Sequence, residues 1–444
     1  MSKEEKIICG DSLEVLKDFE DNYFDSVVTD PPYGLAFMGK KWDYDVPEVE
    51  LWKEVYRVLK PGGHILSFAG SRTYHRMTVN IEDAGFEIRD MLGWLYGSGF
   101  PKSHNIGKAV DKLEGNERET LTEIQKENLF QKEKEIILEK KTKDFSHHKG
   151  SMMSKETTDK FDTKTKNITV SKGNSEWEGW GTALKPAHEP IVMARKPFNT
   201  SVAENVLTHG TGGINIDECR VGTTDNLNGG TYAKNSTMKQ ENATSWSKPV
   251  LKTEFIQPEG RFPANIIHDG SEEVLEIFPE TTSGKMSSKH TRHTDESPHG
   301  IYGKFDINHP LGETYGDTGS AARFFYCAKA SKAERNMGLD DYEEKQVTDG
   351  TIRSNQETAR TFGANSAKRK NYHPTVKPIK LMEYLVRLVT PKEGIVLEPF
   401  AGSGTTLIAC KQQGFQFVGI EKEQEYCDIA EARLKSVQIQ GTLF

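Results

Sequence analysis

The stretch that decides the fold is IVLEPFAGSGTT, at residues 395 to 406. It starts with a short apolar run typical of a buried strand and passes through Gly402 and Gly404 into a helical pattern. A second apolar run, Phe417 to Ile420, ends at Glu421, which lies 17 positions after Gly404. Strand, glycine turn, helix and strand in this order predict one βαβ unit of a parallel sheet.

The same unit has the features of a nucleoside site. Glycines let a ligand approach the backbone, and Glu421, at the end of the following strand, could accept hydrogen bonds from ribose hydroxyls. The turn lacks the full GxGxxG pattern and the GK[ST] of a phosphate-binding loop, which favours a nucleoside without phosphates over a pyrophosphate. An ordinary tight turn is the alternative explanation.

A second motif lies near the N-terminus, where the apolar run Phe24 to Thr29 is followed by Asp30-Pro31-Pro32-Tyr33. Two prolines end a strand, fix the backbone and leave carbonyls that can accept hydrogen bonds. A rigid acceptor beside the Asp30 carboxylate suits an amino group, and the ring of Tyr33 could stack on a base. The alternative is a strand-ending turn with a surface tyrosine.

The two ends of the chain carry further α/β elements. A helix is expected from about Pro47, with a stop at Pro61-Gly62-Gly63, then a strand over Ile65 to Phe68. Near the other end, leucine spacing predicts a helix over Ile379 to Val389. The middle differs, because Gln131 to Ser175 holds eleven lysines and few apolar residues. The pattern predicts an α/β fold whose doubly wound, mostly parallel sheet is built from both chain ends.

Composition limits the class of protein. Hydrophobic residues make up 35% of the 444 residues, and charged residues make up 28%. The sequence contains neither a long apolar run nor an N-terminal secretory signal pattern, so we expect a cytoplasmic protein without a membrane span. Five scattered cysteines lack a CxxC pair, and His290 and His293 lack a thiolate or acidic frame, so no metal site is expected. The net charge of -8 argues against a protein that binds polyanions nonspecifically over its whole surface.

A basic stretch nevertheless precedes the glycine-containing segment at 395–406. Residues 351 to 380 hold seven basic residues against one acidic residue, a local charge of +6. Phosphate contacts are a natural use of such a patch, and Lys368, Arg369 and Lys370 are its densest part. A solvated linker is the alternative.

Taken together, the motifs resemble those of the S-adenosylmethionine-dependent DNA amino-methyltransferases, in the permuted order called the beta class. The resemblance covers roughly residues 7 to 100 and 370 to 436, and extends to Glu189 to Lys196, which looks like the last sheet strand of that family. It is carried by five segments in order: residues 8–12 (ICGDS), 30–33 (DPPY), 59–64 (LKPGGH), 373–378 (HPTVKP) and 398–406 (EPFAGSGTT).

The resemblance implies S-adenosylmethionine as the cofactor. Glu398 would lie near its ammonium group, Glu421 would hold its ribose, and Lys377 would meet its carboxylate, although a solvated charge at a helix start is the alternative for Lys377. The residues implied to bind the cofactor are Asp11, Thr375, Lys377, Glu398, Phe400, Gly402, Ser403, Gly404, Thr405 and Glu421. The residues implied to grip the target amine are Asp30, Pro31, Pro32 and Tyr33.

The predicted function is transfer of a methyl group to the N6 amine of a flipped-out adenine in double-stranded DNA. N4 of cytosine is the alternative within the family, and Asp30 favours adenine because the cytosine enzymes more often carry Ser there. A catalytically dead DNA-binding specificity module is the alternative outside enzymes. Methylation of a protein glutamine or an RNA base is a further one, disfavoured because its motif usually begins with Asn.

The expected organisation is one interrupted catalytic domain. Its parts are residues 1–100, the strand at 181–198 and the cofactor-binding part at 370–444; they are separated by a polar insertion at 101–180 and a target-recognition domain at 199–369. A homodimer and a cognate restriction enzyme are further partners compatible with the resemblance.

Overall fold

The fold is built on a nine-stranded sheet with the order β1-β17-β16-β2-β3-β7-β4-β10-β13. The computed structural model describes residues 4–35, 43–99, 103–120, 171–225, 227, 257–282, 318–328, 334–346 and 368–437. In sheet order the strands are β1 (Glu5–Cys9), β17 (Gln416–Glu421), β16 (Ile395–Glu398), β2 (Phe24–Thr29), β3 (Leu59–Phe68), β7 (His188–Arg195), β4 (Glu87–Leu95), β10 (Ile266–His268) and β13 (Tyr326–Cys327).

The strand directions locate the ligand-binding edge of the sheet. Every pairing is parallel except those of β7, which runs antiparallel to both β3 and β4. From β2 the chain winds outward through β3, whereas from β16 it winds the other way through β17. The strand order therefore reverses between β2 and β16, and open α/β sheets bind ligands at such a point, outside the carboxyl ends of the strands.

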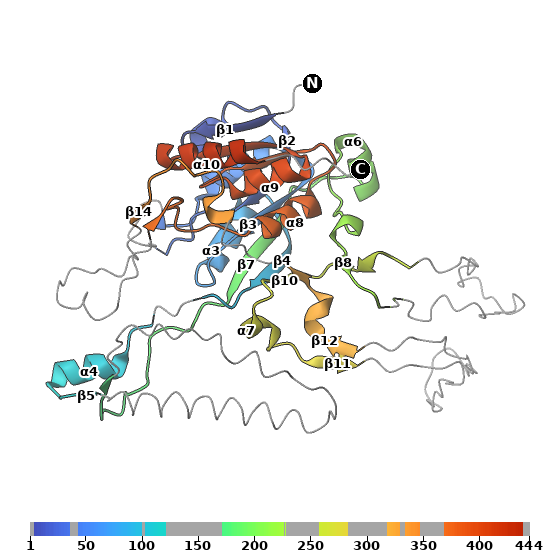
Figure 1. The fold of residues 1–444 in the computed structure, drawn as a ribbon. Coiled ribbons are helices and arrows are strands. Elements are labelled where there is room, and N and C mark those ends of the chain that lie inside the picture. The colour runs from blue at the N-terminus through green and yellow to red at the C-terminus, as the bar shows by residue number, and fades with distance from the viewer. Residues whose placement is uncertain are drawn as a thin grey trace, which may run out of the picture. The chain divides into compact units, whose positions relative to one another are not determined.

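Helices cover both faces of this sheet. One face packs on α8 (Ile379–Val389) and α9 (Thr405–Gln413), with α10 (Gln424–Ser436) beside α9 (Figure 1). The other packs on α1 (Ser12–Leu16), α2 (Val49–Val58) and α3 (Tyr74–Asp83). Because successive strand side chains point to opposite faces, Val27 joins one core and Val28 the other. The predicted doubly wound, mostly parallel sheet is confirmed.

One predicted boundary was wrong. The sequence indicated that Pro61-Gly62-Gly63 ends a helix before a strand that begins at Ile65, but α2 ends at Val58 and β3 begins at Leu59. The prolyl-glycyl segment is an irregular part of the strand, with Gly62 at φ 80° and a register shift opposite β2. Its backbone is paired all the same, since the amide of Gly62 donates to the carbonyl of Lys196 at 2.9 Å.

Short elements complete the part of the chain that contains this sheet. Strands β10 and β13 at the sheet edge come from the segment 199–369, whose assignment to target recognition stays a prediction. The remaining elements are α6 (Val202–His209), α7 (Glu272–Leu275), the 3-10 helices at Asp217–Cys219, Ala321–Phe324 and Glu334–Asn336, and the strand pairs β8 (Val221–Gly222) with β9 (Gly260–Arg261), β11 (Glu280–Thr282) with β12 (Thr318–Ser320), and β14 (Lys345–Gln346) with β15 (Lys368–Arg369).

A second compact unit contains the described residues 99, 103–120 and 171–186. It holds α4 (Ile106–Glu114) and the antiparallel pair of β5 (Glu119–Thr120) with β6 (Ser171–Lys172). Arg118 joins these pieces, because its guanidinium contacts Asp111 and lies 2.8 Å from Glu178. Most of the lysine-rich stretch, up to residue 170, lies outside the described residues. No helix in the described ranges is long and apolar enough to span a bilayer.

Candidate active site

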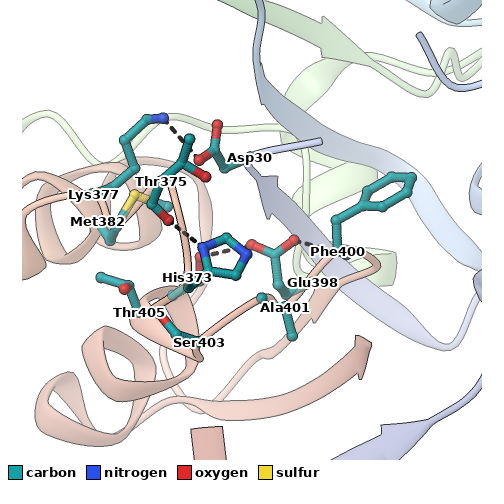
Figure 2. A pocket seen from close by; sticks show the side chains of 12 residues that line it. Asp30, His373, Thr375, Lys377, Met382, Glu398, Phe400, Ala401, Ser403 and Thr405 are labelled. Atoms are coloured by element: carbon teal, nitrogen blue, oxygen red, sulfur yellow. Dashed lines mark hydrogen bonds and ion pairs between the residues drawn. The ribbon is translucent and has the colours of Figure 1, made fainter. Parts of the chain in front are cut away.

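A pocket lies where the strand order reverses. Asp30 borders it from the end of β2, and the segment after β16 supplies most of the remaining wall. The lining residues are Asp30, His373, Thr375, Lys377, Met382, Glu398, Phe400, Ala401, Gly402, Ser403, Thr405 and Thr406 (Figure 2). Of the ten residues predicted to bind the cofactor, seven line this pocket, and they share it with the first residue of the Asp-Pro-Pro-Tyr motif.

The Asp-Pro-Pro-Tyr turn is held by neighbouring polar groups. The amides of Tyr33 and Gly34 donate to the Asp43 carboxylate at 2.7 and 3.0 Å, and the hydroxyl of Thr73 donates to the Tyr33 carbonyl at 2.6 Å. The Tyr33 hydroxyl donates to Asp30 Oδ1 at 2.7 Å. Burial, and then the carboxylates of Asp30 and Glu189, raise the pKa of Tyr33 well above its usual value, so this hydroxyl is a donor at neutral pH.

Lys377 lies deep beside the same carboxylate. Its ammonium is 2.7 Å from Asp30 Oδ2 and 3.2 Å from Glu189 Oε2, and only 7% of its side chain is exposed. Burial disfavours the charged ammonium, but Asp30 and Glu189 outweigh burial and raise the pKa of Lys377. In this structure Lys377 therefore contacts the predicted amine-gripping residue, and it is not a solvated charge.

The glycine turn needs its glycines. Gly402 and Gly404 have φ angles of 51° and 78°, in the left-handed region that other residues rarely adopt. A Cβ on Gly402 would lie 2.9 Å from His373 Nε2. That ring is fixed, because its Nδ1 is 2.6 Å from the Thr375 carbonyl and it packs edge-on against Tyr426.

A buried arginine forms hydrogen bonds with the glycine turn. The Arg433 guanidinium donates to the Ser403 carbonyl at 2.5 Å and to the Ser403 and Thr405 hydroxyls at 3.1 and 3.3 Å. Burial, with Arg335 nearby, lowers the pKa of Arg433 to about 10, so it remains charged at neutral pH. The carbonyls and hydroxyls of the turn are thus fixed before any ligand arrives.

Glu398, at the end of β16, is enclosed by three donors. Its Oε1 accepts from the Thr29 hydroxyl at 2.5 Å and the Phe400 amide at 3.0 Å, and its Oε2 accepts from the Thr406 hydroxyl at 2.6 Å. Burial raises the pKa of Glu398 to about 8 despite these hydrogen bonds. The carboxyl group is therefore mostly protonated at pH 7.

Glu421 and Asp11 lie outside the pocket lining, on neighbouring strand ends. Glu421 Oε2 accepts from the Gly402 amide at 2.8 Å, which joins it to the glycine turn, and burial raises its pKa. Asp11 caps α1 through the Leu13 amide. Its Oδ2 is 2.9 Å from the Lys422 ammonium, and that hydrogen bond lowers the pKa of Asp11. Both carboxylates retain lone pairs that can accept from hydroxyl or amino groups.

The predicted DNA-contacting lysines and arginine are not among the residues that line the pocket. Lys368 and Arg369 form β15, and the Lys370 ammonium donates to the Asp340 carbonyl at 2.5 Å. The rest of the basic stretch, at 351–367, lies outside the described residues, as do His290 and His293. Among the described residues, no group of three or more His, Cys, Asp or Glu side chains could hold a metal ion.

Three of the residues that were assigned no role from the sequence make polar contacts that shape this site: Glu189, His373 and Arg433. Glu189 and His373 stand inside segments that the resemblance marked, at 189–196 and 373–378, but the patterns did not reveal their contacts. Arg433 carried one signal, a charge on the apolar side of the last amphipathic helix, where it is fully buried. A charge at such a position requires a polar partner inside the protein.

The comparisons with known proteins agree with this geometry. A family model described as DNA methylase, for N6/N4 methyltransferases, matches residues 24–432. The chain belongs to this DNA methylase family. The resemblance noted in the sequence is thereby confirmed.

Individual relatives of this DNA methylase align over shorter stretches. It is 49% identical over 69 residues to the type II methyltransferase M.HindIII of Haemophilus influenzae, which covers 16% of this chain and 22% of the relative. It is 39% identical over 77 residues to the type II methyltransferase M.ScaI of Streptomyces caespitosus, 17% of this chain and 25% of the relative. The chain thus spans about a quarter of the length of these curated relatives.

Solved structures align over nearly the whole DNA methylase chain, with low scores. A complex of M1.HpyAVI with SAM aligns with a TM-score of 0.36 and 15% identity, covering 97% of this chain and 99% of that one. The PvuII DNA methyltransferase, described as cytosine-N4-specific, gives a TM-score of 0.40 and 12% identity, covering 100% and 89%. The fold assignment therefore rests on the strand order described above.

Proposed function

We propose that this protein transfers a methyl group from S-adenosylmethionine to the exocyclic N6 amine of adenine in DNA. The observation that carries the proposal is that Asp30 and the glycine turn after β16 border the same pocket at the point where the strand order reverses. One motif suits an amine and the other suits a nucleoside cofactor. A reaction between the two requires them to share a cavity.

The residues of the pocket fit this cofactor. Gly402 lines the pocket without a side chain, so a ligand can approach its backbone. Carboxyl groups of Asp30 and Glu398 face a cationic ligand, and the hydroxyls of Thr375 and Ser403 can bond its polar end. Glu421 would receive the ribose hydroxyls, and Asp11 would lie at the adenine end. When bound, S-adenosylmethionine supplies an electrophilic methyl group on a sulfonium.

Asp30 and Pro31 would position the acceptor nitrogen. The lone pair of an exocyclic amine is delocalised into its ring, so the nitrogen is a poor nucleophile. Hydrogen bonds from its two N–H groups to the Asp30 carboxylate and the Pro31 carbonyl would favour a pyramidal nitrogen with its lone pair toward the methyl group. The C–N bond would form as the C–S bond of the donor breaks, with the electron pair left on sulfur, and Asp30 or water would take the proton that the nitrogen loses.

A single nucleotide would have to leave the DNA duplex to enter the pocket. A base inside a duplex cannot enter such a pocket, so the target nucleotide is expected to flip out and stack on Tyr33. Residues 199–369 are proposed to recognise the target sequence, with Lys368, Arg369 and Lys370 contacting phosphates. The N4 amine of cytosine is the second candidate acceptor, since its chemistry is nearly the same; Asp30 is the feature that favours adenine.

Nucleoside analysis tests the proposal directly. PCR-amplified DNA, which carries no methyl groups, is incubated with the protein and labelled S-adenosylmethionine, then digested to nucleosides. We expect label in N6-methyladenine. Label in N4-methylcytosine alone would replace the first candidate with the second, and absence of label despite measurable cofactor binding would contradict methyl transfer to DNA.

Cofactor affinity is expected to rise with pH between about 6.5 and 8. Glu398 has a pKa of about 8 in the free protein, so it is mostly protonated at the start of this range. A cationic cofactor favours the ionised carboxylate, so its binding releases a proton and becomes tighter as pH rises toward that pKa. The limit for release of one proton is the ratio of the ionised fractions of Glu398 at the two pH values, about 16-fold, so we expect the dissociation constant to fall about three- to fifteenfold.

The control is Glu398→Gln, measured by isothermal titration over the same pH range. The amino group of the cofactor also titrates near pH 8, so the informative quantity is the slope of wild type minus that of the variant. Equal slopes would assign the whole pH dependence to the cofactor and contradict the role of Glu398.

A further inference from the structure

Both oxygens of the Asp30 carboxylate already have partners within the protein. Its Oδ2 is 2.7 Å from the Lys377 ammonium (Figure 2), and its Oδ1 accepts from the Tyr33 hydroxyl at 2.7 Å. A carboxylate oxygen has two lone pairs, so an amine that approaches Oδ2 would share this oxygen with the Lys377 ammonium or displace it. This competition raises the question of where the buried ammonium goes when the amine arrives.

Glu189 offers the ammonium a second partner. Its Oε2 is 3.2 Å from Lys377 Nζ and 3.3 Å from the Tyr33 hydroxyl. Glu189 reaches this place because β7 is antiparallel to β3, with Ile191 opposite Phe68, so the beginning of β7 lies at the edge where the parallel strands end. A reversed strand thus brings a second carboxylate to the carboxyl edge of the sheet.

We propose that Glu189 is a positioning residue of the methyl-transfer site, which retains the Lys377 ammonium when the target amine displaces it from Asp30. The inference rests on the proposed function. Within the described ranges, the ion pairs of Lys377 are those with Asp30 and Glu189. Without Glu189, the exchange would leave a buried ammonium with no carboxylate, and such a charge is costly. Lys377 would then stay on Asp30 and exclude the amine.

The charge balance of this cluster agrees with the proposal. Two carboxylates and one ammonium give a net charge of -1. Lys377 can therefore leave one carboxylate and keep an ionic partner in the other, since it lies 2.7 Å from Asp30 and 3.2 Å from Glu189.

The other titratable groups around the cluster add little charge near pH 7. Burial lowers the pKa of His373 to about 4 and raises that of Glu398 to about 8, so both are largely neutral. Burial is also the first cause of the raised pKa of Tyr33 and of Tyr96, whose hydroxyl contacts Glu189. Rates compared near pH 7 thus report on Asp30, Glu189 and Lys377.

The test combines Glu189→Gln with Lys377→Met, using PCR-amplified DNA and saturating S-adenosylmethionine. Glu189→Gln is expected to lower kcat about 30-fold, with cofactor affinity within about twofold of wild type. The kcat of the double variant should be at least about fivefold higher than that of Glu189→Gln alone, because the ammonium that is bonded to Asp30 is absent. Glu87→Gln, which removes the 2.8 Å ion pair with Arg195 at the other end of β7, is the control and should keep wild-type kcat.

Stability gives a second readout that needs no activity. In the cofactor-free protein, the drop in Tm of the double variant should be smaller than the sum of the two single drops. Glu189→Gln removes one of the two carboxylates that pair with Lys377, and Lys377→Met leaves both carboxylates without that ammonium, so the two losses overlap. Wild-type kcat in Glu189→Gln, or a double variant no faster than Glu189→Gln, would overturn the inference. Failure of wild type itself to methylate DNA would instead refute the proposed function.

Discussion

Asp30→Ala is expected to lower kcat for methyl transfer by about 1000-fold or more, with cofactor affinity changed by less than about threefold. The substitution removes the charged acceptor that orients the amine. Loss of one preorganised electrostatic contact at a reacting group costs about 100- to 1000-fold, and misplacement of the nucleophile adds to this. The glycine turn and Arg433, which shape the cofactor side, do not contact Asp30 and should keep their geometry.

The variant should also fold. Lys377 keeps Glu189 at 3.2 Å when Asp30 is removed, so the buried ammonium is not left without a carboxylate. Asp45→Ala is the matched control, since the Asp45 side chain is 73% exposed and lies twelve positions after Tyr33. Single-turnover rates, isothermal titration and thermal unfolding check the prediction. Substantial activity in folded Asp30→Ala would refute the role of this carboxylate.

The fold was predictable where local patterns agree with the tertiary structure. The leucine spacing of Ile379 to Val389 matches α8 residue for residue, and the run at 395–397 lies within β16. These elements are buried on a regular face or between two helical layers, so their apolar pattern follows the period of the element. Both motifs follow strands at the carboxyl edge of the sheet, and their resemblance to one enzyme family predicted that they belong to one site.

The remainder depends on contacts between residues distant in the sequence. Strands β10 and β13 are three and two residues long and have no periodic pattern; they exist because β4 offers an edge to pair with. Lys377 lies 347 positions from Asp30, and no local pattern indicates that pair. Glu189 is a site residue only because β7 runs antiparallel, and strand direction is a property of the assembled sheet.

Gly402→Val is expected to weaken cofactor binding about 100-fold. A branched side chain at φ 51° strains the backbone by about 1 to 3 kcal/mol. In addition its Cβ would lie 2.9 Å from His373, whose ring is held by the Thr375 carbonyl and by Tyr426. The turn or the histidine must therefore move, and a loss of about 2.7 kcal/mol in binding corresponds to this factor.

The control separates strain from obstruction. Gly210 ends α6 at φ 77°, with no atom within 4 Å of an added Cβ, so Gly210→Val has similar backbone strain without a clash. Its Tm should fall, whereas its cofactor affinity should equal that of wild type. If Gly402→Val also binds S-adenosylmethionine like wild type in isothermal titration, the geometry of this turn and of His373 is not needed for the cofactor, and the proposed cofactor site at the turn is refuted.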